Sequence, residues 1–585
     1  MKENKTWDLT KMYKNNKDWE KDLKDLKKKI ESFSKKDKNI TKNSKYLLET
    51  IEEYLGIQRK LYFVYQYAKL NSDADGLNSE YTKMVMDAEN LLEYFSTNTS
   101  FVNISLKKLN KKLLNSFIKE TPILKEYSHM FDEIIRNKKH VLSEKEEKIL
   151  AESANIRGSF ETVFGKIDAV DVIFDDIKVG KETKELNHSS YSVFIRDKNR
   201  DVRKEAFTKY HEYYKKHANS ISVCLINDIK NDEFIANTRK YKNARNMEMD
   251  SDKISEKVYD DLITSVHNNI DSFYKYLDLK KKANNLDELH MYDLYLFSSN
   301  YDKKWTIEDT KKVLLGSVEV LGKEYTENYK KAFDERWIDF EYRKGKYSGA
   351  YSSGSYDSYP YILMSYNDTF RSTETLAHEM GHSMHSYFSR KNNPYHEAHY
   401  PIFLAEIASN VNELLLFDYM LKNTNDKDVK KYILETILES FKGSVYRQTQ
   451  FAEFEHILHT KIKNNESLSM EDITNIYYDL NKFYYKNIVS DELIKYECLR
   501  VPHFYYNYYV YKYATGLCLA YVFAKRILGK EKNAIENYMK FLKSGRKDYP
   551  LNILKESGVI MNSKIIDEGI ELFKEYLKEY EELIR

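Results

Sequence analysis

The sequence predicts a mainly α-helical fold, and three observations support this prediction. Its 585 residues contain only 6 prolines, with none between Pro122 and Pro360, so long helices can run without interruption. Apolar residues recur at spacings of three and four near both ends of the chain, as on the buried face of a helix. Only two stretches are rich in β-forming residues. We therefore expect a large helical body with little sheet.

Two amphipathic stripes predict helices near the two ends of the chain. Each has an apolar residue every three or four positions, which lines up one face of a helix. We interpret both stripes as faces that pack into the core. They consist of Trp19, Leu23, Leu26, Ile30 and Phe33, and of Ile566, Ile570, Phe573, Leu577 and Tyr580.

The β-prone stretches predict two small elements. Residues 170–186 alternate β-formers with Asp and Gly, which indicates a hairpin that turns at Val179-Gly180-Lys181. Residues 337–367 hold two β-prone runs on either side of a glycine- and tyrosine-rich loop. We expect these runs to form a small antiparallel sheet beside the helix that follows them.

Composition excludes several classes of function. The 94 basic residues nearly balance the 92 acidic ones, whereas nucleic-acid-binding proteins carry a basic excess. No apolar run approaches the ~18 residues that span a bilayer, and the N-terminus has no apolar signal core. Three widely spaced cysteines are typical of a reducing compartment. We expect a cytoplasmic protein with neither a nucleic-acid nor a membrane partner.

The segment His378-Glu379-Met380-Gly381-His382 matches the motif H-E-x-x-H. On a helix, residues four apart share a face, so both imidazoles can reach one tetrahedral zinc ion. Glu379 lies beside them and has the position of a general base. Ser372 and Thr373 are the expected caps at the start of this helix.

A catalytic zinc ion needs a third protein ligand and an open position for water. The metzincin pattern would need glycine at position 385 and histidine at position 388, where this chain has His385 and Phe388. The other known solution takes a glutamate from a second helix, and Glu406 lies among apolar residues there. We interpret Glu406 as the third ligand of one zinc ion per chain. His385 and Glu413 are expected to orient the ligand imidazoles.

This pattern, with Phe403 three residues before Glu406, resembles the thimet oligopeptidase and oligoendopeptidase F family. The run Glu406-Ile407-Ala408-Ser409 is most like oligoendopeptidase F, because the thimet branch usually carries proline two residues after its ligand glutamate. Other segments similar to the family span nearly the whole chain. They are Trp7-Asp8-Leu9, residues 289–294, residues 349–354 and Pro502-His503-Phe504-Tyr505.

The resemblance implies a zinc endopeptidase with two helical lobes around a deep channel that admits short unfolded oligopeptides. We expect an N-terminal helical lobe over residues 1–190 and a catalytic domain over residues 191–585. Zinc would polarise the scissile carbonyl, while Glu379 takes a proton from the attacking water. The loop with Gly349, Tyr351 and Gly354 would hold the peptide backbone by strand addition.

The resemblance also implies a histidine and two tyrosines that stabilise the oxyanion. In the thimet branch these tyrosines lie seven residues apart on one helix. Tyr506 and Tyr513 have that separation and follow His503. The gap from His503 to the first tyrosine is three residues here and five in the thimet pattern, so Tyr508 and Tyr509 remain alternatives to Tyr506.

Two rival functions find less support in the sequence. A zinc aminopeptidase usually carries a Gly-x-Met-Glu-Asn-like motif before H-E-x-x-H, and this chain has none. A binding protein with a degenerate peptidase fold would have lost a ligand or the base, but all four residues are present. We therefore predict internal cleavage of oligopeptides. Residue preference and oligomeric state do not follow from the sequence.

Overall fold

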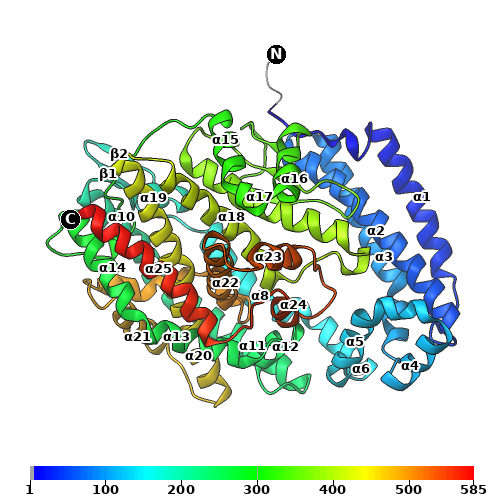
Figure 1. Cartoon of the computed structure of the whole chain (residues 1–585). Helices are drawn as coiled ribbons and strands as arrows, with labels where there is room; N and C mark the ends of the chain where they lie inside the picture. The colour runs from blue at the N-terminus through cyan, green and yellow to red at the C-terminus, as the bar shows by residue number, and fades with distance from the viewer. Residues whose placement is uncertain (1–4, 300) are drawn as a thin grey trace. The chain divides into compact units, whose positions relative to one another are not determined.

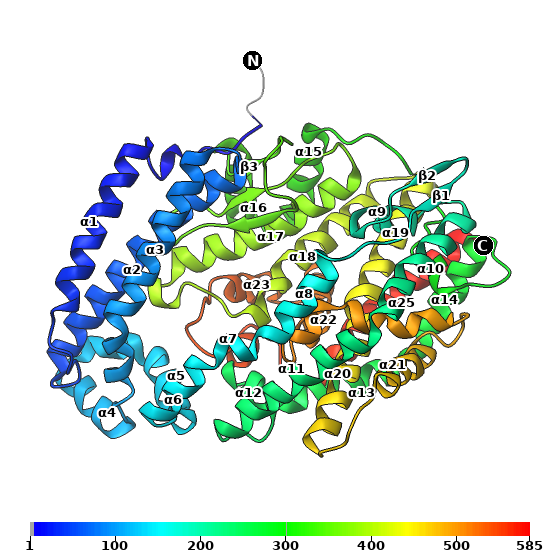
Figure 2. The same cartoon turned by 180° about the vertical axis from the view of Figure 1, so that it is seen from behind.

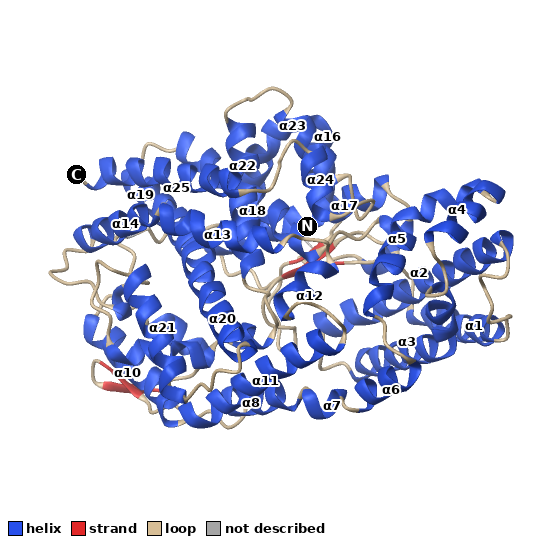
Figure 3. Cartoon of the chain, turned by 90° about the horizontal axis from the view of Figure 1, so that it is seen from below, coloured by secondary structure: helices blue, strands red, loops and turns tan. Residues whose placement is uncertain are grey.

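The computed structural model describes residues 5–299 and 301–585. Helices account for most of this part of the chain, and its strands form only two small sheets (Figure 3). The predicted mainly α fold is confirmed. Among the described helices, none combines the length and the apolar character that crossing a bilayer requires.

The chain divides into two compact units, each made of three segments. Unit 1 comprises residues 1–139, 302–419 and 523–559, and unit 2 comprises residues 140–301, 420–522 and 560–585. These units divide the chain differently from the expected boundary at residue 190, because the chain returns to each unit more than once. That boundary stays a prediction about sequence segments.

Unit 1 contains the N-terminal helices and those that carry the H-E-x-x-H motif. Helices α1, α2 and α3 pack against one another (Figure 1). The predicted N-terminal stripe lies on α1, where Trp19, Ile30 and Phe33 are buried. The helices of unit 1 are α1 (Asn16–Ser34), α2 (Ser44–Ala74), α3 (Ser79–Leu106), α4 (Lys111–Glu120), α5 (Ser128–Asn137), α15 (Ile307–Val318), α16 (Lys323–Asp334), α17 (Phe370–Asn392), α18 (Ile402–Lys422, which ends in unit 2), α23 (Ala534–Leu542) and α24 (Pro550–Glu556).

Unit 2 contains the C-terminal helix α25 (Ser563–Ile584), which packs against α13, α14 and α19 (Figure 2). All five apolar residues of the predicted C-terminal stripe are buried on it. The other helices are α6 (Glu144–Glu152), α7 (Ala154–Arg157), α8 (Ser159–Ala169), α9 (His188–Phe194), α10 (Arg200–Lys216), α11 (Ala218–Thr238), α12 (Ala244–Ser251), α13 (Glu256–Asn268), α14 (Ile270–Ala283), α19 (Lys427–Phe441), α20 (Arg447–Lys463), α21 (Met470–Tyr484) and α22 (Tyr511–Leu528, which ends in unit 1).

Asparagine side chains begin many of these helices. An asparagine oxygen accepts a backbone N–H of the first turn and so satisfies a donor that has no partner within the helix. Such caps begin α1, α2, α3, α4 and α25, at Asn15, Asn43, Asn78, Asn110 and Asn562.

The predicted hairpin is confirmed in unit 2. Strands β1 (Ile177–Val179) and β2 (Glu182–Lys184) pair antiparallel, with Val179 opposite Glu182. Gly180 turns the chain with φ at +64°, a conformation that glycine adopts without strain.

The predicted sheet beside the motif helix is present in unit 1, but it is mixed rather than antiparallel. It has the order β3-β5-β4, with β3 (Ile338–Asp339), β4 (Tyr351–Ser353) and β5 (Tyr361–Leu363). β4 pairs antiparallel with β5, whereas β3 runs parallel to β5 on the other side. Strand β4 lies within the glycine-rich loop and occupies one edge of β5. Strand β3 therefore pairs with the opposite edge of β5.

Candidate active site

Helix α17 carries the H-E-x-x-H motif in unit 1. Thr369 caps this helix, since its Oγ1 accepts the N–H of Ser372 at 3.2 Å. The expected caps Ser372 and Thr373 instead lie in the first turn. Thr369 precedes them in extended conformation and therefore reaches the free N–H groups first.

Gly381 allows α17 and α18 to approach each other closely. A Cβ atom at this position would lie 2.5 Å from the carbonyl oxygen of Ala408 and 2.5 Å from the Cα of Ser409. No real Cβ atom tolerates such contacts. The glycine that is unfavourable within a helix therefore lets Glu406 of α18 come next to the histidines of α17.

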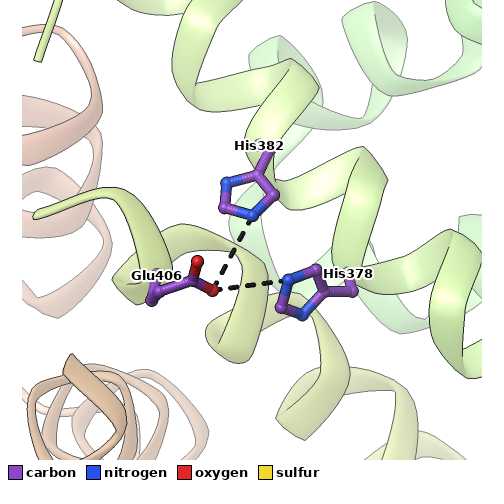
Figure 4. Close-up of side chains that lie close together, drawn as sticks. All are labelled: His378, His382 and Glu406. Carbon is purple, nitrogen blue, oxygen red and sulfur yellow. Dashed lines mark ion pairs between the residues drawn. The ribbon is translucent and has the colours of Figure 1, made fainter. Parts of the chain in front are cut away.

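The three predicted ligands lie together on these two helices (Figure 4). Glu406 Oε2 lies 3.4 Å from His378 Nε2 and 3.8 Å from His382 Nε2. The three donor atoms all lie within 4.8 Å of one another. All three side chains are half-buried, so they remain accessible to an ion and to a substrate.

This donor set fits a zinc ion. Zinc bonds to imidazole nitrogen and carboxylate oxygen are about 2.0–2.2 Å long, so tetrahedral ligands have donor atoms roughly 3.3–3.5 Å apart. The separations of Glu406 from the two imidazoles are close to this spacing. Two histidines and one glutamate also leave a fourth position open, as catalytic zinc sites do.

Hydrogen bonds hold each ligand in a binding orientation. His378 Nδ1–H donates to Glu413 Oε1 at 2.5 Å, so Nε2 of the same ring faces Glu406. The imidazole of His382 hydrogen-bonds to the backbone of Ala405. Ser409 Oγ lies 3.0 Å from the backbone carbonyl oxygen of Glu406 and 3.2 Å from its Oε2 atom, and its proton can be donated to either. Glu413 thus has the contact expected of a residue that orients a ligand imidazole.

The charges of the three ligands complement each other. Burial raises the pKa of Glu406, but the His378 hydrogen bond and the charges of both imidazoles outweigh burial and lower it to about 2. Burial lowers the pKa of His378, yet its hydrogen bonds to Glu406 and Glu413 raise it well above the ordinary value. Burial and the charge of His378 lower the pKa of His382 to about 4. At neutral pH the site therefore offers a carboxylate at Glu406 and a neutral imidazole at His382, whereas His378 is protonated and would have to release a proton to bind a metal.

Glu379 is buried next to the ligands, and it contacts the small sheet. Burial raises its pKa to about 7, while a backbone hydrogen bond from Ser352 of β4 favours the carboxylate. The hydroxyls of Ser352 and Ser383 lie 2.8 Å apart and link β4 to α17. The sequence did not indicate Ser352, because a backbone N–H leaves no side-chain pattern.

His385 makes a different contact from the one predicted. Its ring stacks on Tyr400, with centroids 3.6 Å apart, and only 1% of its surface is exposed. Its Nδ1 atom is buried without a hydrogen-bond partner among the described residues. The predicted orienting role of His385 thus rests on position alone and stays a prediction.

The predicted peptide-binding residues lie in and around β4. Gly349 has φ at +94°, which favours glycine over any other residue. A Cβ on Gly354 would lie 2.4 Å from the carbonyl oxygen of Tyr359, so any larger residue would clash with the backbone there. The Tyr351 hydroxyl donates a hydrogen bond to Asp73 Oδ2 at 2.8 Å, so its proton is already used within the protein. These three residues shape the strand, and their contact with substrate stays a prediction.

The predicted oxyanion residues form a cluster in unit 2, whereas the ligands belong to unit 1. The His503 ring lies 5.6 Å from Tyr506, 5.8 Å from Tyr513 and 6.0 Å from Tyr509, measured between centroids. The Tyr513 hydroxyl lies 3.5 Å from His503 Nε2. Burial and the charge of Arg447 lower the pKa of His503, which favours the neutral ring.

The thimet pattern, carried over to this chain, would place Tyr506 and Tyr513 on one helix, and that expectation is wrong. A 3₁₀ segment spans Pro502–Tyr505, and α22 begins only at Tyr511. Between them Asn507 and Tyr508 have positive φ, which interrupts any helix. Tyr506 and Tyr513 nevertheless both contact His503.

The alternatives left open for the second tyrosine differ in exposure. Tyr508 is only 2% exposed, and its hydroxyl lies 3.1 Å from His456 Nδ1, so its phenol is engaged within unit 2. Tyr506 is 46% exposed and Tyr509 is half-buried. Because Tyr508 is buried and its hydroxyl already has a partner, Tyr506 and Tyr509 remain as candidates for the second oxyanion donor.

Comparison with known proteins shows the family of this chain. The sequence model of Peptidase family M3 matches residues 193–567, and that of Oligopeptidase F matches residues 106–174. The Bacillus subtilis oligopeptidase PepF is 39% identical over 99% of this chain and 87% of its own length.

Two solved structures are similar over nearly the whole chain. A Chlamydophila abortus protein described as a peptidase has a TM-score of 0.91 and 34% identity, over 99% of this chain and 98% of that one. Oligoendopeptidase-F from Enterococcus faecium has a TM-score of 0.74 and 32% identity, over 97% of this chain and 99% of that one. This chain therefore belongs to peptidase family M3 and is a metallopeptidase.

Proposed function

We propose that this protein is a zinc endopeptidase that cleaves internal bonds of short, unfolded oligopeptides. The observation that carries the proposal is the convergence of His378, His382 and Glu406 within 4.8 Å, on two helices that also bring Glu379 next to strand β4. Peptidases of family M3 depend on zinc.

The three ligands would hold one zinc ion per chain. When bound, zinc supplies Lewis-acid chemistry, which polarises the scissile carbonyl and lowers the pKa of water toward ~7. Glu413 keeps His378 in the tautomer whose Nε2 lone pair is free for the metal. The Ser409 hydroxyl, which lies within hydrogen-bond distance of both the Oε2 atom and the backbone carbonyl oxygen of Glu406, supports this carboxylate.

Glu379 moves the protons of the reaction. Its carboxylate takes a proton from the attacking water and later delivers it to the leaving amine. The backbone hydrogen bond from Ser352 keeps this carboxylate at β4, where a peptide would lie. A base whose pKa lies near the working pH performs both transfers efficiently.

Strand β4 offers a place for the substrate backbone. It is an edge strand of the described sheet, which has the order β3-β5-β4, so among the described residues β4 pairs only with β5. An extended peptide can add to such an edge through main-chain hydrogen bonds. The hydrogen bond between Ser352 and Glu379 would then put the scissile bond near the base.

The cluster around His503 would supply the oxyanion donors. Tyr506 and Tyr513 each meet the His503 ring edge-on, at interplanar angles of 73° and 77°. A phenol donates a hydrogen bond without ionising, and this bond strengthens as negative charge develops on the carbonyl oxygen. We therefore assign the two donor roles to Tyr506 and Tyr513, with His503 beside them.

The cysteines support a reducing compartment, such as the cytoplasm, for this enzyme. Cys224, Cys498 and Cys518 are all free and buried. Unpaired cysteines are the rule where thiols are kept reduced. Oligopeptides that arise in the same compartment would be its substrates.

Digestion of blocked peptides tests the proposal. Peptides of about ten residues, acetylated at the N-terminus and amidated at the C-terminus, should be cut internally, with products identified by mass spectrometry. A folded domain of similar composition should resist. Strict dependence on a free N-terminus would instead indicate an aminopeptidase.

A further inference from the structure

The turn that precedes α22 is held in an unfavourable backbone conformation. Asn507 and Tyr508 are consecutive residues other than glycine, with φ at +22° and +53°. Side chains with a Cβ atom disfavour this region, and a bulky residue such as tyrosine rarely adopts it. Such a conformation persists only where surrounding contacts impose it.

A buried glutamate of α20 contacts this turn directly. The backbone N–H of Tyr508 donates to Glu455 Oε1 at 2.6 Å, and Glu455 is only 2% exposed. The second carboxyl oxygen, Oε2, is buried without a hydrogen-bond partner among the described residues. A buried carboxyl group that satisfies one oxygen alone is poorly placed for stability. Stability alone therefore does not account for a glutamate at position 455, whose only side-chain hydrogen bond among the described residues is the one from the Tyr508 N–H.

The same stretch of α20 holds the Tyr508 side chain. The Tyr508 hydroxyl lies 3.1 Å from His456 Nδ1, and its ring centroid lies 4.6 Å from that of His459. Tyr259 packs edge-on against it at 5.4 Å. Tyr508 is thus fixed through both its backbone and its side chain, whereas Tyr506, two residues earlier, is 46% exposed.

We infer that Glu455 is a positioning residue for the cluster of His503, Tyr506 and Tyr513. By accepting the N–H of Tyr508, it imposes the turn at residues 507–508 and thereby sets where Tyr506 lies relative to His503. This inference rests on the proposed function, in which that cluster stabilises the oxyanion. Glu455 acts through the backbone of Tyr508 and is not itself a catalytic residue.

Two substitutions separate the hydrogen bond from the bulk of the side chain. Glu455→Gln keeps an oxygen that can accept the Tyr508 N–H. Burial raises the pKa of Glu455 to about 8, so a neutral side chain already occupies this place near pH 7. Glu455→Leu removes the acceptor and keeps a similar volume. Should the leucine variant fail to fold, Glu455→Met provides the same test with an unbranched chain.

The readouts are hydrogen exchange of peptides that cover residues 503–513 and steady-state kinetics on a blocked oligopeptide. We expect Glu455→Leu to speed exchange at residues 506–510 and to lower kcat at least tenfold, with KM changed less than threefold. Glu455→Gln should keep both near wild type. A further variant, Glu455→Leu with Asn507→Gly, should recover part of kcat, because glycine adopts positive φ freely.

Glu435 provides a matched control in the same unit. It is 3% exposed on α19 and accepts hydrogen bonds from Ser298 and Tyr580. Glu435→Leu should lower the free energy of unfolding but leave both the exchange of residues 506–510 and kcat unchanged. If Glu435→Leu lost as much kcat as Glu455→Leu, the loss in both variants would be explained by general destabilisation. That result would overturn the inference.

Parallel Tyr→Phe variants distinguish the inference from the proposed function. If Tyr506→Phe and Tyr513→Phe lose activity while Glu455→Leu keeps wild-type kcat and exchange, the role of Glu455 is overturned and the oxyanion role stands. If both Tyr→Phe variants and Tyr509→Phe keep wild-type kcat, the oxyanion role of the cluster fails, and this inference fails with it. Equal losses in Glu455→Gln and Glu455→Leu would show that the hydrogen bond to Tyr508 is not the cause.

Discussion

His378 Nδ1 lies 2.5 Å from Glu413 Oε1, so a carboxylate holds one nitrogen of the ring whose other nitrogen would bind zinc. A partner of this kind fixes the tautomer and makes the free nitrogen a stronger ligand. Glu413→Leu should weaken zinc affinity about 10–100-fold, as measured by competition with a chelator of known affinity. Glu413→Gln keeps an acceptor oxygen and should lose less, and equal losses in the two variants would contradict this role.

Zinc content gives the most direct test of the ligand set. The purified protein should hold about one zinc ion per chain, since one open tetrahedral site uses all three donors. Chelation should abolish cleavage, and added zinc should restore it. His382→Ala should lose both the metal and the activity. Full activity in protein shown to be metal-free would rule out the proposed site.

The role of Glu379 is separable from metal binding. Glu379→Gln keeps the size of the side chain but cannot take a proton from water. It should retain zinc and lose at least the ~10²–10⁴-fold that a positioned acid–base group contributes. Turnover near that of the wild type, with zinc content confirmed, would assign the base to another residue.

Gly381 predicts an unusual response to a helix-favouring substitution. Gly→Ala inside a helix ordinarily stabilises by roughly 1 kcal/mol. Gly381→Ala should instead destabilise the protein and weaken zinc binding, because its Cβ would push α18 away from α17. Gly56 in α2 is the matched control, since a Cβ there would meet nothing within 4 Å. Thermal unfolding measures the change in stability, and metal analysis measures the zinc content. Equal stabilisation by alanine at positions 381 and 56 would contradict the close approach of α17 and α18.

The tyrosine cluster predicts unequal effects of Tyr→Phe substitutions. Removal of one oxyanion donor should cost about 10²–10³ in kcat, or ~3–4 kcal/mol, with little change in KM. We expect this loss in Tyr513→Phe and Tyr506→Phe, and changes within severalfold in Tyr508→Phe and Tyr509→Phe. Tyr505 is the control, because its hydroxyl is buried without a partner among the described residues. A large loss at 509 with none at 506 would reassign the second donor.

Much of the fold, and the grouping of the candidate metal-binding residues, could be predicted because the relevant signals are local. The apolar stripes that end in Phe33 and Tyr580 follow the period of a helix, and both lie on helices. The spacing of His378 and His382 depends only on helix geometry. Glu406 needed one further step, namely that a carboxylate among apolar residues is expected to have a partner.

The remaining features depend on contacts between distant residues. We infer that Glu455, which lies 53 positions earlier in the chain, imposes the positive φ of Tyr508. The local sequence around Tyr508 therefore does not indicate that the helix is interrupted there. The parallel pairing of β3 with β5 depends on which edge β4 occupies, and alternation of side chains does not encode that choice. The hydrogen bond from Ser352 to Glu379 uses a backbone group that every residue except proline possesses.

If substrates add to β4 at the edge that is unpaired in the described sheet, as proposed, that edge determines which molecules can bind. Main-chain pairing recognises N–H and C=O groups, which are the same in nearly every residue, so sequence alone would exclude few peptides. It would exclude chains whose N–H and C=O groups are already bonded to one another, as they are in any folded domain. On this view β4 discriminates by conformational state, and a protein becomes a substrate only after its own secondary structure has been dismantled.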